Sequence, residues 1–139
     1  MRIKKTEKFY LIRLDKGDEI ITVLKKICQK YKIKAGLISG IGALGKVTIG
    51  NFNPINKKYT SKEFIGNFEL VSFSGNVSVF GKETYLHLHA ILADPRMRCF
   101  GGHLNSGVVS ATFEGIIISS PGKIDRKFSP EVGLNLLKI

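Results

Sequence analysis

All three histidines of this 139-residue chain lie close together in the sequence, as His87, His89 and His103. His87 and His89 are separated by one residue in a run rich in β-forming residues, so both rings project from the same face of a strand. A turn signal separates this run from His103. If Ala93 pairs with Cys99 across that turn, antiparallel counting sets His89 opposite His103, and opposite residues share a face. The spacing therefore predicts that all three imidazoles converge.

Three neutral imidazoles suit Zn²⁺ or another borderline divalent ion, and three protein ligands leave one coordination position open. A base or supporting carboxylate could come from Glu69, Asp94 or Glu114, and sequence alone ranks none of them. In the alternative interpretation the histidines only pack or hydrogen-bond within a sheet. A register slip of one residue would send the third ring to the other face.

Length and composition are those of a single globular domain. The chain is 43% hydrophobic and 24% charged, and at this length it can bury a core without disulfides or a structural metal. No apolar run approaches the roughly 18 residues of a membrane span, and no apolar segment follows the basic N-terminus as in a secretion signal. Cys28 and Cys99 form no CxxC pair, which is typical of free thiols in a reducing compartment. We expect one domain over residues 1–139, located in the cytoplasm and not in a membrane.

One amphipathic helix and a series of short strands account for the hydrophobic pattern. With Asp18 as the N-cap, apolar residues recur at three- and four-residue spacing as far as Tyr31, which predicts a helix of about 14 residues. Beyond Ala35, Gly, Asn and Pro divide the chain into β-branched and aromatic runs. The predicted strands cover residues 9–14, 35–39, 46–53, 59–65, 68–80, 84–93, 99–104, 108–119 and 134–139. This pattern predicts an α+β domain with a mainly antiparallel sheet packed against one principal α-helix.

The glycines at Gly40, Gly42 and Gly45 match the G-x-G-x-x-G string of dinucleotide sites. That use requires a helix that begins directly at the turn, whereas residues 46–52 have the pattern of another strand. We therefore exclude nucleotide binding here. The glycines are expected to let the chain turn sharply and approach another backbone closely.

Basic residues outnumber acidic ones by 22 to 11, for a net charge of +11. The excess lies near the N-terminus, where Lys25, Lys26 and Lys30 lie on the polar side of the predicted helix. Arginine, which reads base edges, is scarce, so any DNA contact is expected to involve phosphates and to be salt-sensitive. The alternative is a solvated lysine-rich face without a ligand.

Four segments share a pattern with one known family. They are Leu37–Leu44 (LISGIGAL), Gly66–Gly75 (GNFELVSFSG), Leu86–Ala90 (LHLHA) and Gly101–Leu104 (GGHL). In this order they resemble the PPC domain (plants and prokaryotes conserved) of plant AT-hook nuclear-localised proteins and of stand-alone bacterial and archaeal proteins. Asn67 stands where plant members have arginine, so partner contacts that depend on that arginine are not carried over.

The resemblance implies a single domain, with one helix on a mainly antiparallel sheet, that assembles as a homotrimer through its sheet edges. It also implies that the residues at the family's His-x-His and Gly-Gly-His positions, here His87, His89 and His103, hold zinc, as in some prokaryotic members. The family is labelled DNA-binding largely because plant members carry AT-hooks, and no AT-hook is found in this sequence.

Three functional hypotheses follow. In the first, a stand-alone PPC protein forms a homotrimer, holds zinc at the three histidines and contacts DNA phosphates through Lys25, Lys26 and Lys30. In the second, the same centre belongs to a metal-dependent, hydrolase-like enzyme, with Glu69 as the base beside a zinc-bound water. In the third, the chain is an assembly module whose metal is incidental.

Overall fold

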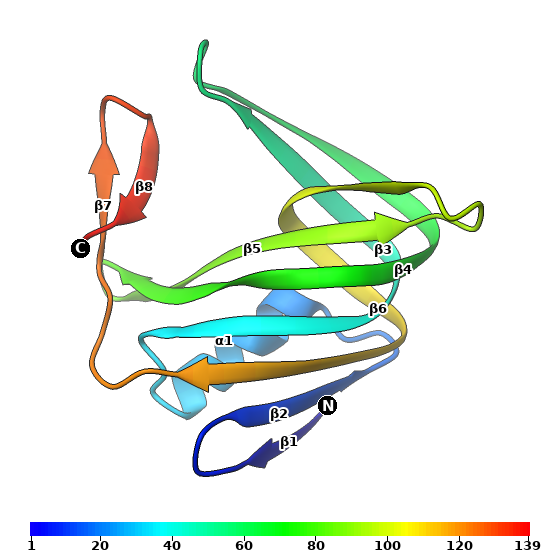
Figure 1. The fold of residues 1–139 in the computed structure, drawn as a ribbon, viewed down its shortest axis with the longest axis horizontal. Coiled ribbons are helices and arrows are strands. Elements are labelled where there is room, and N and C mark those ends of the chain that lie inside the picture. The colour runs from blue at the N-terminus through cyan, green and yellow to red at the C-terminus, as the bar shows by residue number, and fades with distance from the viewer.

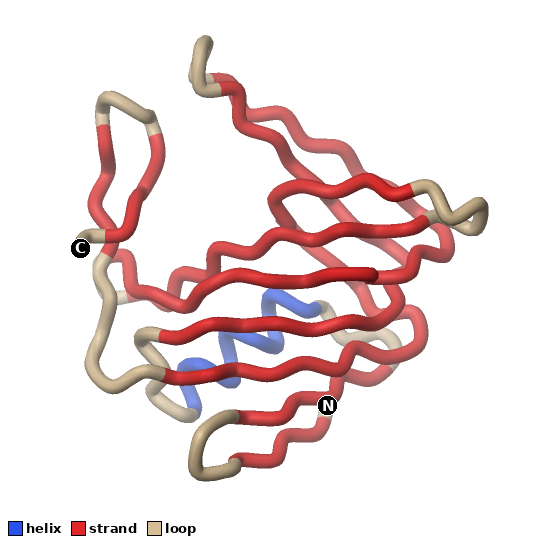
Figure 2. The backbone as a smooth tube through the Cα atoms, in the orientation of Figure 1, coloured by secondary structure: helices blue, strands red, loops and turns tan.

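The structure, a computed structural model, describes residues 1–139 and contains a mostly antiparallel β-sheet with one short helix (Figures 1 and 2). The elements in chain order are β1 (Arg2–Lys5), β2 (Tyr10–Asp15), α1 (Ile20–Lys30), β3 (Gly36–Asn53), β4 (Lys58–Phe80), β5 (Glu83–Ala93), β6 (Cys99–Ser119), β7 (Arg126–Ser129) and β8 (Leu134–Leu137). The sequence predictions found all of these regions except β1 and β7.

Helix α1 packs its apolar side against the sheet, with Ile20, Leu24 and Ile27 fully buried. The predicted N-cap was wrong by one residue. The cap is Glu19, whose carboxylate accepts hydrogen bonds from the backbone N–H groups of Ile21 and Thr22. The helix has 11 residues, fewer than predicted. It is too short to span a membrane.

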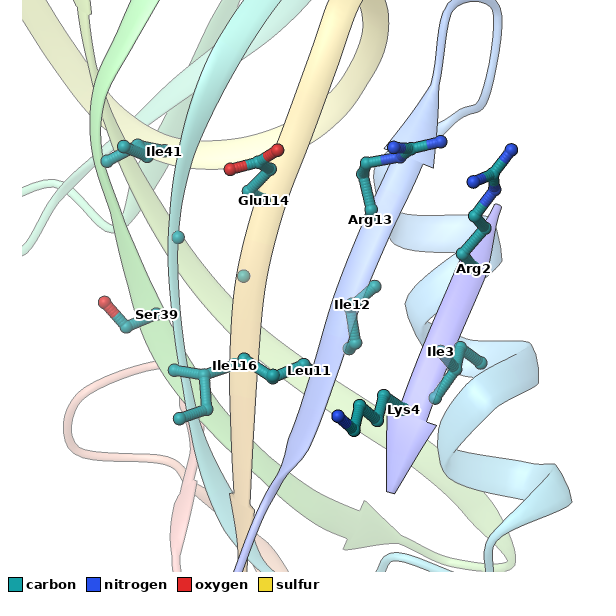
Figure 3. Close-up of a pocket in the computed structure, with 12 residues that line it drawn as sticks. Arg2, Ile3, Lys4, Leu11, Ile12, Arg13, Ser39, Ile41, Glu114 and Ile116 are labelled. Atoms are coloured by element: carbon teal, nitrogen blue, oxygen red, sulfur yellow. The ribbon is translucent and has the colours of Figure 1, made fainter. Parts of the chain in front are cut away.

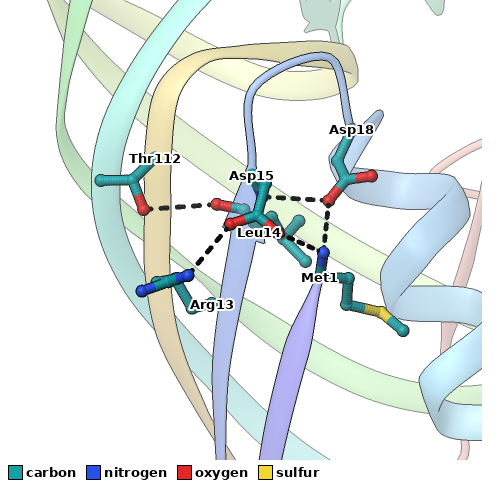
Figure 4. Close-up of polar contacts among 6 residues, drawn as sticks. All are labelled: Met1, Arg13, Leu14, Asp15, Asp18 and Thr112. Atoms are coloured by element: carbon teal, nitrogen blue, oxygen red, sulfur yellow. Dashed lines mark hydrogen bonds and ion pairs between the residues drawn. The ribbon is translucent and has the colours of Figure 1, made fainter.

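The carboxylate of Asp18 is used in the preceding turn, which explains why it does not cap the helix (Figure 4). It accepts a hydrogen bond from the backbone N–H of Asp15 at 3.0 Å and lies 3.4 Å from the amino group of Met1. Asp15 also contacts this amino group, and that hydrogen bond holds the pKa of the Asp15 carboxyl below its usual value.

Three strands are much longer than predicted, because glycines that were interpreted as strand ends lie inside continuous strands. Strand β3 continues through Gly40, Gly42 and Gly45, with shifts in register instead of a sharp turn. Strands β4 and β6 likewise each join two predicted strands. Since no helix follows the glycine string, the exclusion of a dinucleotide site is consistent with the structure.

The six-stranded sheet has the order β1-β2-β6-β3-β4-β5, and β5 also pairs with β6. Hydrogen bonding therefore runs in a closed circuit through β3, β4, β5 and β6. Strand β6 makes this possible because its first residues pair with β5, its middle with β3 and its end with both β3 and β2. In Figure 1 this strand curves from the upper strands of the sheet, beside β5, to the lower strands, beside β2.

The core is organised around two aromatic rings, Phe73 and Phe113, whose centroids lie 5.1 Å apart in an edge-to-face arrangement. Gly40 and Gly115 pair directly in the sheet beside Phe113. A Cβ atom at either glycine would lie less than 3 Å from the Phe113 ring. The missing side chain of Gly40 makes room for this ring, whereas the close approach to another backbone expected at the glycine string is confirmed at Gly42, beside the backbone of Thr112 and Phe113.

A separate two-stranded hairpin, β7–β8, follows the main sheet (Figure 1). A backbone bridge from Asp125 to Val79 and contacts between β7 and β4 hold it beside the sheet. This hairpin stands next to the strand that carries two of the histidines.

Candidate metal centre

Strand alternation and strand pairing bring the three histidines together. On β5, His87 and His89 lie on the same face, two residues apart. Ala93 pairs with Cys99, and this register sets His89 opposite His103 on β6. The register predicted from the sequence is therefore the one observed.

The imidazoles present their nitrogens to one common point. The Nε2 atoms of His87 and His89 lie 3.3 Å apart, and one nitrogen from each of the three rings lies within 4.8 Å of the others. With Zn–N bonds of about 2.0–2.1 Å, two nitrogens of a tetrahedral site lie about 3.4 Å apart. The donor set and its spacing fit a zinc-sized divalent ion.

Burial keeps two of these rings in the neutral form that binds metals. It lowers the pKa of His87 to about 4, with smaller contributions from His103, Arg126 and His89. Burial also lowers the pKa of His103, to which His89 contributes. Both rings are therefore neutral at pH 7, so an incoming cation displaces no proton from them.

The three histidines open into a cavity of about 810 Å³ between the main sheet and the β7–β8 hairpin. Phe52, Tyr59, Tyr85 and Arg126 line it near the sheet, and leucines of β8 form its other wall. No aspartate or glutamate side chain is among the lining residues. A cation at the histidines would therefore meet no acidic side chain in the cavity.

Glu69, the candidate base, lies apart from the histidines. It pairs with Ala93 at the far end of β5 from His87 and lines a different cavity, together with Thr112 and Glu114. Asp94, another candidate carboxylate, is held by hydrogen bonds and an ion pair to Arg98 in the β5–β6 loop. The structure thus places none of the three candidate carboxylates in the cavity.

The three lysines of interest project from α1. Lys25, Lys26 and Lys30 are all exposed, form no ion pair, and do not line the histidine cavity. They form a basic surface that is distinct from the metal centre.

Sequence reasoning missed three polar residues of the cavity. Tyr85 continues the alternation of His87 and His89 by two residues, so the strand pattern could have identified it. The Tyr59 ring lies edge-on to His103, with its hydroxyl donating to Asn105. Arg126 comes from the distant β7 strand, and no local pattern connects it to the histidines.

The fold and the histidine cluster define a class: small proteins with an almost entirely antiparallel sheet, one helix and a candidate three-histidine metal centre. Residues 1–121 match the model of the Plants and Prokaryotes Conserved (PCC) domain, and the chain belongs to this family. The resemblance drawn from the four sequence segments is therefore confirmed.

Solved structures from other organisms share the whole fold. A "putative dna binding protein" from Bacteroides thetaiotaomicron superposes with a TM-score of 0.95 at 31% identity, covering 99% of this chain and 96% of that one. A plant- and prokaryote-conserved (PPC) protein from Pyrococcus horikoshii has a TM-score of 0.86 at 33% identity, with 99% and 94% coverage. A protein from Archaeoglobus fulgidus described as metal-containing has a TM-score of 0.86 at 31% identity, covering all of both chains.

Among curated proteins, the bifunctional protein GlmU of a Synechococcus strain is 27% identical over 129 residues. This match covers 91% of the chain but only 19% of that protein. The chain therefore spans about a fifth of this relative's length.

Proposed function

We propose that this chain is a cytoplasmic PPC-type protein that forms a homotrimer and binds zinc through His87, His89 and His103. The observation that carries the proposal is the convergence of three imidazole nitrogens within 4.8 Å. The metal-containing Archaeoglobus relative supports it. The zinc content of the untagged protein tests it.

The cavity gives this centre room for a ligand. Three protein ligands leave one position open, and bound zinc would supply Lewis-acid chemistry there. The chain itself contributes neutral imidazoles and the Tyr59 hydroxyl, which is engaged with Asn105. The hydrolase-like alternative lacks the carboxylate base that the sequence suggested, because Glu69 lies elsewhere. We therefore favour a binding function over hydrolysis.

The proposed homotrimer is supported by an apolar surface on the outer side of the sheet. Leu11, Leu37, Ile41 and Ile118 are large hydrophobic residues that are all at least 45% exposed. Figure 3 shows Leu11, Ile41 and Ile116 around a hollow over β1, β2, β6 and β3, with charged side chains such as Arg13 and Glu114 at its border. The volume of this hollow is about 590 Å³. Uncovered apolar surface of this kind marks an interaction site.

We expect Ile41→Lys to convert the trimer into monomers. Ile41 is 60% exposed and pairs with Glu114 in the sheet, so a lysine can form a cross-strand ion pair within one chain. In an assembled trimer the same lysines would be desolvated among apolar side chains. Native mass spectrometry measures the outcome.

Ile55→Lys provides the matched control, because Ile55 lies at the tip of the β3–β4 hairpin and is 92% exposed. This control is expected to remain a trimer. A wild-type protein that is monomeric at micromolar concentration would contradict the proposed assembly.

DNA binding is the second candidate function, favoured by the exposed lysines of α1 and by the relatives named as candidate DNA-binding proteins. Reversing the charge of Lys25, Lys26 and Lys30 together is expected to weaken binding about equally on all sequences. The loss of three phosphate contacts should reduce the slope of log K against log salt by about 3. Fluorescence anisotropy over a salt series measures this slope.

Lys58→Glu serves as the control, because Lys58 is exposed on a hairpin far from α1 in the sequence. It should leave the slope nearly unchanged. Absent or salt-insensitive binding by the wild-type protein would remove the DNA hypothesis.

A further inference from the structure

We propose that the cavity beside the three histidines binds a small organic monocarboxylate with an apolar tail, and that Arg126 holds the carboxylate group. This inference rests on the proposed function, since it assigns a ligand class to the same cavity. The charge of Arg126, its position and the chemistry of the opposite wall point to this ligand.

Arg126 carries a nearly buried positive charge that no acidic group of the chain neutralises. Its side chain is only 9% exposed, and no aspartate or glutamate forms an ion pair with it. All its acceptors are neutral: Nε donates to Ser78 Oγ, Nη1 to the Asn135 carbonyl and Nη2 to Asn76 Oδ1, each at 2.7 Å. A guanidinium has five N–H groups, so two remain without a protein acceptor.

The guanidinium lies on the histidine side of the cavity. It stacks over the Tyr85 ring at 4.4 Å, and Tyr85 precedes His87 by two residues on the same face of β5. This spacing corresponds to about 7 Å along a strand. Asn76, which accepts from Nη2, is also the direct strand partner of His87. Arg126 and the histidines therefore border one small volume.

A purely structural role would not require this charge. Two hydrogen bonds to neutral acceptors on β4 attach the hairpin to the sheet, a third joins β7 to β8, and a neutral donor could make such bonds. Burial of an unpaired charge is unfavourable, and an anion in the cavity would offset this cost. Arginine also matches the planar, two-oxygen geometry of a carboxylate.

The β8 wall of the cavity, opposite the sheet, indicates that the rest of the ligand is apolar. Leu134, Leu136 and Leu137 of β8 line the cavity on this side, and each of these leucines is more than one-third exposed. Their apolar surface is uncovered in the isolated chain. A hydrocarbon group attached to the carboxylate would cover it.

The first test compares two ligands of the same shape on the wild-type protein, once loaded with zinc and once after removal of zinc, because a carboxylate can also bind the open position of a zinc ion. The probes are 4-methylpentanoate and its neutral amide, 4-methylpentanamide, titrated by isothermal calorimetry. We expect the carboxylate to bind at least 10-fold more tightly than the amide, and also more tightly than acetate, which lacks the tail. Equal affinity for the acid and the amide, or no binding of either, would overturn the proposal.

The second test uses Arg126→Gln, which removes the charge and keeps a hydrogen-bond donor. Its affinity for 4-methylpentanoate should fall at least 10-fold. Arg96→Gln, at an exposed arginine in the β5–β6 loop without an ion pair, makes the same change in net charge and should leave affinity unchanged. Unchanged affinity in Arg126→Gln would contradict the assignment. If that variant does not fold, the comparison of acid and amide on the metal-free wild-type protein decides.

Zinc content, measured separately on the same samples, distinguishes the two proposals. Stoichiometric zinc without a preference for the carboxylate would reject this ligand and leave the metal centre in place. A zinc-free protein that cannot be loaded, but still prefers the acid over the amide in an Arg126-dependent way, would reject the metal centre and support the anion site.

Discussion

Replacing His89 with alanine is expected to reduce the zinc content of the protein from near one ion per chain to background. His89 is one of three rings whose centroids lie 5.1–5.5 Å apart, with its Nε2 atom 3.3 Å from that of His87 and its Cα opposite His103 in the sheet. Loss of groups that merely support metal ligands costs 10- to 100-fold in affinity, so loss of a ligand itself should cost at least about 100-fold. Elemental mass spectrometry on untagged protein measures the result.

The same loss is expected for His87→Ala and His103→Ala. Tyr85→Phe is the matched control, because it changes a residue of the same cavity without removing an imidazole. The histidine variants should remain folded, since the buried core does not depend on the metal. A wild-type protein that is free of metal and cannot be loaded would contradict the proposal. Loss of the trimer together with the metal would indicate a structural role for the zinc.

Phe113→Ala is expected to produce the largest loss of stability, about 3–5 kcal/mol in the free energy of unfolding. The ring is fully buried, packs edge-to-face on Phe73 and fills the space beside Gly40 and Gly115. Alanine at position 113 would leave a cavity beside Gly40 and Gly115. The strands that carry these glycines are paired in the sheet, so they cannot move to fill it. The melting temperature should fall by on the order of 10 °C.

Phe128→Ala is the matched control, since Phe128 lies on β7 and is 54% exposed. It should change the melting temperature by little. Thermal denaturation at one fixed protein concentration is required, because assembly makes the transition depend on concentration. Equal shifts for the two variants would show that Phe113 is not central to the core.

The convergence of the histidines could be predicted because it depends on local rules. Alternation along a strand places His87 and His89 on one face, and a short connecting turn leaves few registers for His103. Both rules act over fewer than twenty residues, and the observed pairing of His89 with His103 follows them. The antiparallel sheet with a single helix was likewise predictable from the periodicity of apolar residues.

Details that depend on competing local partners were predicted less well. Asp18 and Glu19 can both cap a helix. The Asp18 carboxylate accepts a hydrogen bond from the backbone N–H of Asp15 in the preceding turn, so Glu19 caps the helix. The glycines of β3 are compatible with a turn or with a continuous strand. Pairing with β4 on one side and β6 on the other keeps the strand continuous, and Gly40 leaves room there for the Phe113 ring.

Residues 87 to 103 determined on their own which side chains form the histidine cluster, whereas the cavity around this cluster depends on the tertiary structure. Arg126 reaches Asn76 across 50 positions in the chain, and the β8 leucines face histidines from a different sheet. Glu69 had the right chemistry for a base, but strand pairing places it at the other end of β5. Contacts between distant segments arise from packing and charge burial over the whole domain, so they cannot be predicted from a short sequence pattern.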